Sequence, residues 1–284
     1  MTPSTTAPSD SPPPLPGKAG AFVRAWAAEP HGRAGRALRT AGVVVFWLVV
    51  WQLLAWAANS TLLLSPPADV VVRFVELVPT AGFWASIALS GSHIVSGFLL
   101  AMVIGTGLAV AGAAWPLLAA LLSPLMRALR AVPVVSFVLL VLIWADASSL
   151  SIIITFIMVM PMVHANVAEG CGARDVQLVE MAAVFGFDTG RRWWAITLPG
   201  MMPYVTAAAR VGLGLCWKSG VSAEVIGLTS GSIGERLYEA KLFLSTGDLF
   251  CWTAVIVALA WVVEKAGLGA LTALDARLGK AYAR

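Results

Sequence analysis

The best candidate for a functional segment in this sequence is EMAAVFGFDTGRRWWAITLP, at positions 180–199. This stretch carries one glutamate, one aspartate and two arginines, whereas long apolar runs flank it on both sides. Small alanines beside charged side chains suit docking, because a small side chain lets a partner surface approach closely. The stretch therefore predicts a loop that contacts another protein rather than a catalytic centre.

The residue types around this stretch predict a helix, a turn and a second short helix. Residues 175–185 form the first helix, and Gly186 ends it because glycine tolerates the left-handed conformation of a helix C-cap. Asp188 is a suitable N-cap for the second helix, which runs through Trp194. Pro199 suits the first turn of the apolar helix that follows.

Four polar residues inside apolar stretches are candidates for lining a solute path, because polar groups in a membrane usually face a bundle interior or a watery cavity. Lys218 could attract an anion, although its long stem would also let it reach the outer headgroups. It lies six residues before Glu224, so the two do not share a helix face. Asn166 ends an apolar run, and Ser136 follows Pro133, where freed backbone groups need polar neighbours.

The motifs that would let the chain perform covalent or metal chemistry on its own are missing from the sequence. No G-x-x-x-x-G-K-[ST] motif occurs, so ATP hydrolysis by that route must come from another subunit. Cys171, Cys216 and Cys251 lack metal-ligand spacing. No serine has the Gly-x-Ser-Gly context of an intramembrane protease. We therefore predict no catalytic residue, no metal site and no cofactor.

The composition indicates a membrane protein. Only 12% of the 284 residues are charged, whereas an ordinary soluble domain carries about 25%. Mean hydropathy is +0.84. Several apolar runs approach or exceed the roughly 20 residues that a helix needs to cross a bilayer. We therefore expect an all-α integral membrane protein rather than a large soluble domain.

Six transmembrane helices are predicted from apolar runs that end at glycine, proline or charge. Residues 66–80 carry too many charges to span and are expected to lie along the outer surface. A helix over 116–131 is expected to enter the membrane obliquely. The predicted spans cover residues 41–58, 86–113, 131–145, 149–168, 200–225 and 247–264.

The Lys and Arg residues place both termini in the cytoplasm, because basic residues concentrate in cytoplasmic segments. Residues 1–40 then form a disordered basic tail, 41–270 the transmembrane domain, and 271–284 a C-terminal tail. The longest cytoplasmic loop is 169–198, which contains most of the stretch quoted above. Fourteen of the 19 Lys and Arg residues lie on the cytoplasmic side in this topology: Lys18, Arg24, Arg33, Arg36, Arg39, Arg127, Arg130, Arg174, Arg191, Arg192, Lys265, Arg277, Lys280 and Arg284.

The stretch resembles the EAA loop of ABC-importer permeases, which reads Glu-Ala-Ala, three residues, Gly, nine residues, then Ile-x-Leu-Pro. Met181 departs from it where the first alanine is usual. LLLSPPADVV and RALRAVPVVSFVLLVLIW resemble the nitrate/sulfonate/taurine branch of this family, and the resemblance covers residues 41–270. The residues that fall on the loop pattern are Glu180, Ala182, Gly186, Ile196, Leu198 and Pro199.

The resemblance implies the type I ABC importer permease fold and a transporter subunit rather than an enzyme. In that family the loop is a coupling helix that sits in a groove of a separate ATPase. The resemblance also implies two ATPase copies, a second permease copy or homologue, an extracytoplasmic solute-binding protein and no nucleic acid, in the inner membrane of a prokaryote. Contact with the ATPase is implied for Glu180, Ala182, Ala183, Gly186, Ile196, Leu198 and Pro199.

The solute is less well defined by the sequence. The branch implies a small organic anion such as a sulfonate or taurine, or nitrate, and Lys218 agrees with an anion. A neutral or cationic heterocycle, such as a vitamin precursor, is the alternative within the family. A stand-alone secondary transporter is the alternative outside it, although an ion-coupled carrier is expected to have more buried carboxylates.

Overall fold

The computed structural model describes residues 33–58, 63–173 and 176–282, and all regular elements within these ranges are helical. The chain divides into two compact units, Met1–Ala57 and Ala58–Arg284. The described part of the first unit is the helix α2 (Arg33–Ala58), whose section Ala37–Ala58 is long and apolar enough to cross a membrane. The second unit contains the remaining helices and is described by itself below.

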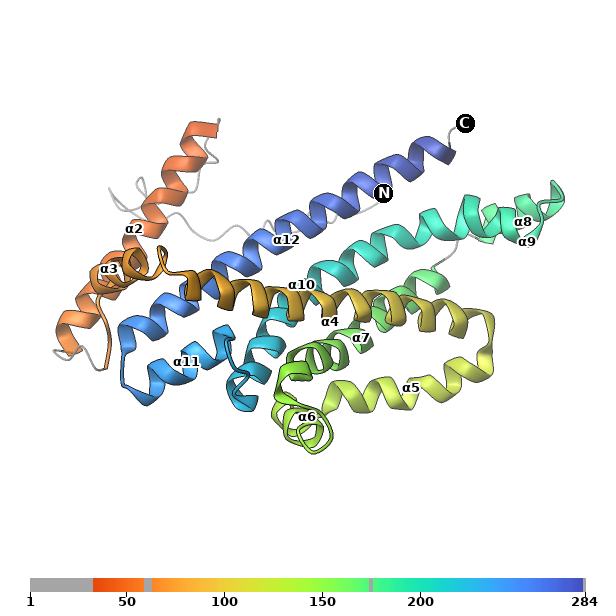
Figure 1. The fold of residues 1–284 in the computed structure, drawn as a ribbon. Coiled ribbons are helices and arrows are strands. Elements are labelled where there is room, and N and C mark those ends of the chain that lie inside the picture. The colour runs from red at the N-terminus through yellow and green to blue at the C-terminus, as the bar shows by residue number, and fades with distance from the viewer. Residues whose placement is uncertain (1–32, 59–62, 174–175, 283–284) are drawn as a thin grey trace, which may run out of the picture. The chain divides into compact units, whose positions relative to one another are not determined.

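Three long helices form the centre of the second unit (Figure 1). α7 (Ala147–Gly172) packs along both α4 (Ala81–Ala114) and α10 (Leu198–Gly227). Side chains of α7 such as Ile154 and Val159 are completely buried there. The helices that pack around this centre are α3 (Pro67–Leu77), α5 (Pro116–Ala131), α6 (Val134–Val141), α11 (Ile233–Leu242) and α12 (Thr246–Tyr282).

Small residues allow α4 to approach α7 closely. A Cβ atom added at Gly97 would lie 2.6 Å from the carbonyl oxygen of Ile152, so no larger side chain fits there. Close contact of this kind holds helices together in a membrane, where an apolar side chain gains little by leaving lipid. Buried small residues repeat at every fourth position of α4 and so share one helix face: Gly97, Ala101, Gly105 and Ala109.

The predicted spans agree with the structure in part. Among the described residues, four helices are long and apolar enough to cross a membrane, in α2, α4, α7 and α12. The predicted third span, 131–145, contains only the short helix α6, which is bent by 101° from α5; the pair is one broken span or a re-entrant segment. α10 occupies the predicted fifth span but falls outside these four, since polar residues such as Arg210 lower its hydropathy. Six spans and the cytoplasmic side of the termini stay predictions.

Other segment boundaries follow the sequence closely. α5 covers the predicted helix 116–131, and α3 lies within the charged segment 66–80. The predicted C-terminal tail, from residue 271, continues α12 as helix to Tyr282. Residues 1–32 of the predicted N-terminal tail lie outside the described residues.

An aromatic cluster joins four helices at one end of the second unit. The ring centroid of Phe83, in α4, lies 5.2 Å from that of Trp252 in α12 and 6.1 Å from that of Phe74 in α3. Ile233, in α11, is completely buried in the same cluster. These contacts fix α3 and α11 to the ends of the long helices.

Candidate functional site

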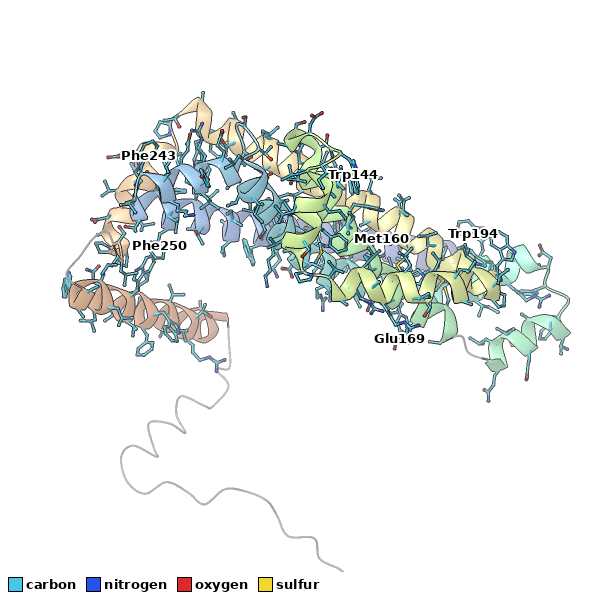
Figure 2. The ribbon with its side chains drawn as sticks, turned by 90° about the horizontal axis from the view of Figure 1, so that it is seen from below. Trp144, Met160, Glu169, Trp194, Phe243 and Phe250 are labelled. Carbon is cyan, nitrogen blue, oxygen red and sulfur yellow. The ribbon has the colours of Figure 1, made fainter. Side chains whose placement is uncertain are left out.

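The predicted coupling loop is a helix-turn-helix that connects α7 to α10. It lies at the end of the second unit remote from α11 (Figure 1), and Figure 2 shows Trp194 near this end and Phe243 near the other. Separation of the loop from α11 agrees with the predicted topology, which places them on opposite sides of the membrane. The loop consists of α8 (Val176–Val184), α9 (Thr189–Arg192) and the π-helical turn η1 (Trp193–Thr197).

The chain reverses after α8 through a Schellman motif. Gly186 has φ +68°, a left-handed conformation that costs glycine little. The N–H of Phe187 donates to the carbonyl oxygen of Ala182 at 2.9 Å, and the N–H of Gly186 donates to that of Ala183 at 3.1 Å. These two bonds define the motif and satisfy carbonyl groups at the helix end. The predicted role of Gly186 as the end of the first helix is confirmed.

Asp188 caps the second helix, as predicted. Its Oδ1 accepts a hydrogen bond from the N–H of Arg191 at 3.3 Å. The Arg191 guanidinium lies 4.5 Å from the ring centroid of Phe187, and Arg192 Nε donates to the Phe187 carbonyl oxygen at 2.9 Å. Both arginines therefore brace the turn by contacts within the loop.

The sequence predicts that the second helix ends at Trp194. In the structure this helix instead continues into α10. The N–H of Leu198 bonds to the carbonyl oxygen of Trp193, five residues earlier, which is the π-helical spacing. Pro199, in the first turn of α10, has no N–H to donate, so a wider turn is tolerated before it. The second part of the loop, α9 and η1, forms one continuous helical segment with α10 over residues 189–227.

The residues predicted to contact the ATPase do not share one surface. Ala182 is buried within the chain, at 1% exposure. Glu180, Ala183 and Gly186 are exposed, whereas Ile196, Leu198 and Pro199 are half-buried where the loop joins α10.

Three exposed apolar side chains, in α8 and directly after it, were not predicted as contact residues. Met181, Val184 and Phe185 are 48%, 85% and 72% exposed. In a mostly apolar sequence, these residue types are expected to be buried. Only their position in a loop remote from the packed helices could have indicated that they are exposed. Together with Glu180 and Ala183 they give α8 a largely apolar outward surface.

The predicted path residues are not brought together. Lys218 is exposed, whereas Glu224 is completely buried, as their separation on one helix suggests. Asn166 is half-buried and donates its amide N–H to the carbonyl oxygen of Met162 on its own helix at 2.8 Å. Ser136 is exposed in the first turn of α6. The position of these residues on a solute path stays a prediction.

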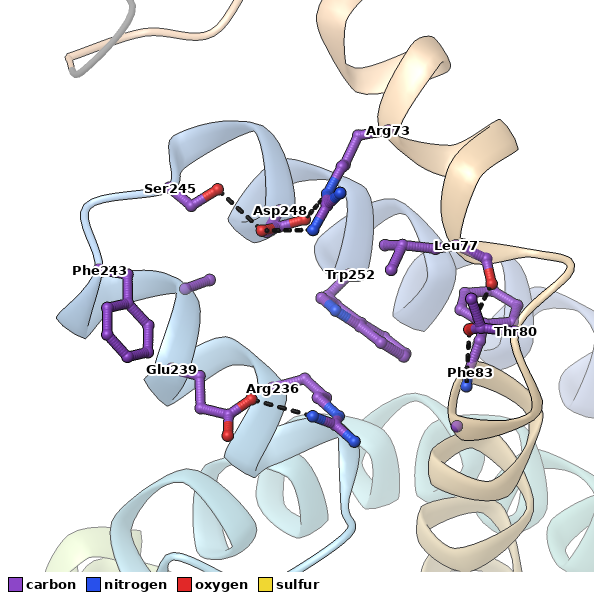
Figure 3. Close-up of a pocket in the computed structure, with 12 residues that line it drawn as sticks. Arg73, Leu77, Thr80, Phe83, Arg236, Glu239, Phe243, Ser245, Asp248 and Trp252 are labelled. Carbon is purple, nitrogen blue, oxygen red and sulfur yellow. Dashed lines mark hydrogen bonds and ion pairs between the residues drawn. The ribbon is translucent and has the colours of Figure 1, made fainter.

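A cavity of about 340 Å³ lies at the opposite end, between α3, α4, α11 and α12 (Figure 3). Arg73 donates to Asp248 through two guanidinium nitrogens and to Glu76 at 2.8 Å, and these bonds raise the pKa of Arg73 above its ordinary value. Arg236 Nη1 donates to Glu239 at 3.1 Å. Because each arginine is paired within the chain, the cavity has balanced charge rather than the excess of positive charge that an anion site needs.

Comparison with known proteins gives one matching family and several similar permeases. The family described as "Binding-protein-dependent transport system inner membrane component" matches residues 101–280. The taurine transport system permease protein TauC of Escherichia coli is 30% identical over 84% of this chain and 87% of its own length. The putative aliphatic sulfonates transport permease protein SsuC of Bacillus subtilis is 26% identical over 75% and 76%. The bicarbonate transport system permease protein CmpB of Synechococcus elongatus is 26% identical over 81% and 86%.

Proposed function

We propose that this chain, which belongs to the binding-protein-dependent transport system inner membrane component family, forms the solute path of an ATP-driven importer. Family membership makes it a multi-pass inner-membrane permease of an ABC transport system. The relatives that it matches are transport permeases rather than enzymes. The proposal concerns how ATP hydrolysis is coupled to the path, which partners complete the assembly and which solute crosses.

The geometry of the loop between α7 and α10 is the observation that carries the proposed coupling. α8 presents Glu180 and a largely apolar surface at the remote end of the second unit, and the Schellman turn at Gly186 fixes its direction. The chain lacks a nucleotide-binding motif of its own. In our proposal this surface of α8 enters a groove of a separate ATPase.

The continuous helical segment over residues 189–227 supplies the mechanical link. A push on α8 is passed through the turn to α9, because Arg191 and Arg192 bind the turn to it. From α9 the helix runs without a break into α10. Such a movement shifts the assembly between two conformations only if the nucleotide binds one conformation more tightly than the other.

The proposed assembly has two ATPase copies, a second permease copy or a homologue, and an extracytoplasmic solute-binding protein. The family description supports the binding protein directly, because it names binding-protein-dependent transport. A path at the interface of two permeases would be lined by exposed polar residues, for which Lys218 and Ser136 are candidates, with Asn166 partly covered. Glu224 reaches such a path only if the helices that cover it move apart.

The proposed solute is a small anion, such as a sulfonate, taurine or nitrate. Relatives named for taurine, aliphatic sulfonates and bicarbonate support this class. The exposed Lys218 on α10 agrees with an anion, because its ammonium group would attract one.

Reconstitution in lipid vesicles with the ATPase and the solute-binding protein tests this function. We expect ATP hydrolysis to rise when the binding protein carries a sulfonate or another small anion, and solute uptake to require all three components. A rise with neutral or cationic heterocycles alone would contradict the proposed solute. Uptake by the permease without an ATPase would contradict the proposed coupling and favour a secondary transporter.

A further inference from the structure

The first turn of α11 has an unusual distribution of hydrogen bonds. Ser232 Oγ accepts from the N–H of Glu235 at 3.0 Å, and Glu235 Oε2 accepts from the N–H of Gly231 at 2.6 Å. This arrangement resembles a capping box, in which a serine and a glutamate three residues later satisfy the helix start. The N–H groups of Ile233 and Gly234 lie between these residues and need acceptors from elsewhere.

Those two N–H groups are bound by side chains of α4 and α10. Ile233 N–H donates to Ser90 Oγ at 2.9 Å, and Gly234 N–H donates to Glu224 Oε2 at 3.2 Å. The Ser90 hydroxyl in turn donates to the same Glu224 oxygen at 2.7 Å. A carboxylate at a helix N-terminus is favoured by the helix dipole and by charge-assisted hydrogen bonds. Three helices therefore meet at one carboxylate.

The backbones of α10 and α11 touch at this point. A Cβ atom added at Gly234 would lie 2.3 Å from Glu224 Cβ and 2.6 Å from the backbone nitrogen of Val225. The short connection between the two helices is tied down as well, because Thr229 Oγ1 donates to the carbonyl oxygen of Ala147 at 2.8 Å. The joint is close-packed as well as hydrogen-bonded.

Oε2 of Glu224 is compensated by these donors, and Glu224 forms no ion pair among the described residues. The ion pairs formed among the described residues join Arg73 to Glu76 and Asp248, and Arg236 to Glu239. Glu224 and Ser90 are both 0% exposed. A buried carboxylate costs free energy unless it is hydrogen-bonded, so the bonds to Oε2 offset part of this cost only while α4, α10 and α11 stay together.

We propose that Glu224 is a positioning residue that fastens α11 to the outer end of α10, so that α11 moves with α10 as one body. The purpose of that movement rests on the proposed function. The helical segment 189–227 begins at the coupling loop and ends at this joint, so a displacement of the loop reaches α11. α11 contributes Arg236 and Glu239 to the cavity at the outer end. A movement of α11 would therefore change the surface that the binding protein meets, according to the nucleotide state of the ATPase.

Hydrogen exchange of the complete transporter in lipid nanodiscs tests the joint itself. Glu224→Ala removes the shared acceptor, and we expect the amides of residues 233–235 to exchange about tenfold faster or more, as loss of a hydrogen bond to a charged group implies. Glu224→Gln keeps an acceptor oxygen and is expected to retain most of the protection. Glu239→Gln, on the exposed side of the same helix, is the matched control and should leave these amides unchanged. Unchanged exchange in Glu224→Ala would overturn the proposal.

Ser90→Ala provides a second route if Glu224→Ala fails to assemble. It leaves the carboxylate in place and removes the acceptor of the Ile233 N–H, so residue 233 should lose protection more than residue 234. Equal protection in Ser90→Ala and the wild type would count against the joint. This comparison needs only the folded permease and does not depend on ATPase coupling.

ATP hydrolysis separates a positioning role from a merely structural one. We expect the Glu224→Ala complex to keep its ATPase partner and its basal hydrolysis, while stimulation by the loaded binding protein falls about fivefold or more, the range of an ordinary coupling energy. Glu224→Gln should restore much of the stimulation. If the wild-type chain never binds an ATPase, the proposed function fails but the exchange result stands. If Glu224→Ala instead changes the KM for solute with residues 233–235 still protected, Glu224 belongs to the path and the proposal is wrong.

Discussion

Substitution of Gly186 tests whether the reversal after α8 is required for coupling. Its φ of +68° lies in the left-handed region, and a Cβ atom there would meet nothing within 4 Å, so the effect is conformational rather than steric. Alanine costs about 1–2 kcal/mol in this conformation, whereas asparagine tolerates it better. Proline fixes φ near −65° and removes the N–H that bonds to Ala183 at 3.1 Å. Proline cannot adopt φ +68° at all and also loses this hydrogen bond, so Gly186→Pro should open the turn at a cost of roughly 3 kcal/mol or more.

The assay is solute uptake and binding-protein-stimulated ATP hydrolysis in reconstituted vesicles. We expect Gly186→Asn to stay close to the wild type, Gly186→Ala to be reduced, and Gly186→Pro to lose both activities while inserting normally in the membrane. Gly200→Ala is the matched control, because it lies in the helical first turn of α10 and its Cβ has open space. Full transport by Gly186→Pro, with the turn shown to be open by hydrogen exchange, would refute the role given to this loop.

Three further substitutions test other parts of the structure. Glu180→Lys reverses the charge on the exposed side of α8 and should abolish uptake with unchanged membrane insertion; normal uptake would contradict ATPase docking there. Gly97→Leu forces a side chain against a carbonyl oxygen of α7 that lies 2.6 Å from the Cβ position. It should lower the thermal unfolding midpoint in detergent, as overpacking of about 1–3 kcal/mol implies, whereas Gly91→Ala, with open space, should not. Arg73→Ala removes the ion-pair partner of Asp248 and should loosen residues 66–80 by about 1 kcal/mol, a value discounted for the 43% exposure of the arginine side chain. Limited proteolysis measures this loosening. If Asp248→Asn, added to Arg73→Ala, does not recover part of the lost stability, the role given to the ion pair is contradicted.

Local turn chemistry explains why the loop could be predicted from the sequence. Gly186 and Asp188 act through hydrogen bonds to residues at most five positions away, so their types and spacing carry the information. The helix over 116–131 could be predicted in the same way, because Pro116 begins it and Pro133 follows its end. The family resemblance added the proposal that the loop contacts an ATPase, which no residue type states by itself.

Features that depend on contacts between distant segments could not be predicted in this way. Glu224 was predicted as a path residue from its position in an apolar run, but its partner Ser90 lies 134 positions earlier. The break at Val132–Pro133 could be predicted from the proline, whereas the 101° size of the bend between α5 and α6 could not. Ala182 matches the loop pattern in sequence, yet folding buries it and leaves Met181 and Phe185 exposed beside it. Burial of this kind is decided by tertiary packing and not by residue type.

Cysteine cross-linking from α8 to the ATPase tests the central claim most directly. Ala183→Cys places a thiol on the exposed side of α8, and the three native cysteines are buried, so the new thiol should dominate the reaction. We predict a cross-link from residue 183 to the ATPase in assembled membranes, and its loss in the Gly186→Pro background. No cross-link in an assembled, hydrolysing complex, or labelling of residue 183 by an impermeant reagent from outside the cell, would contradict the account.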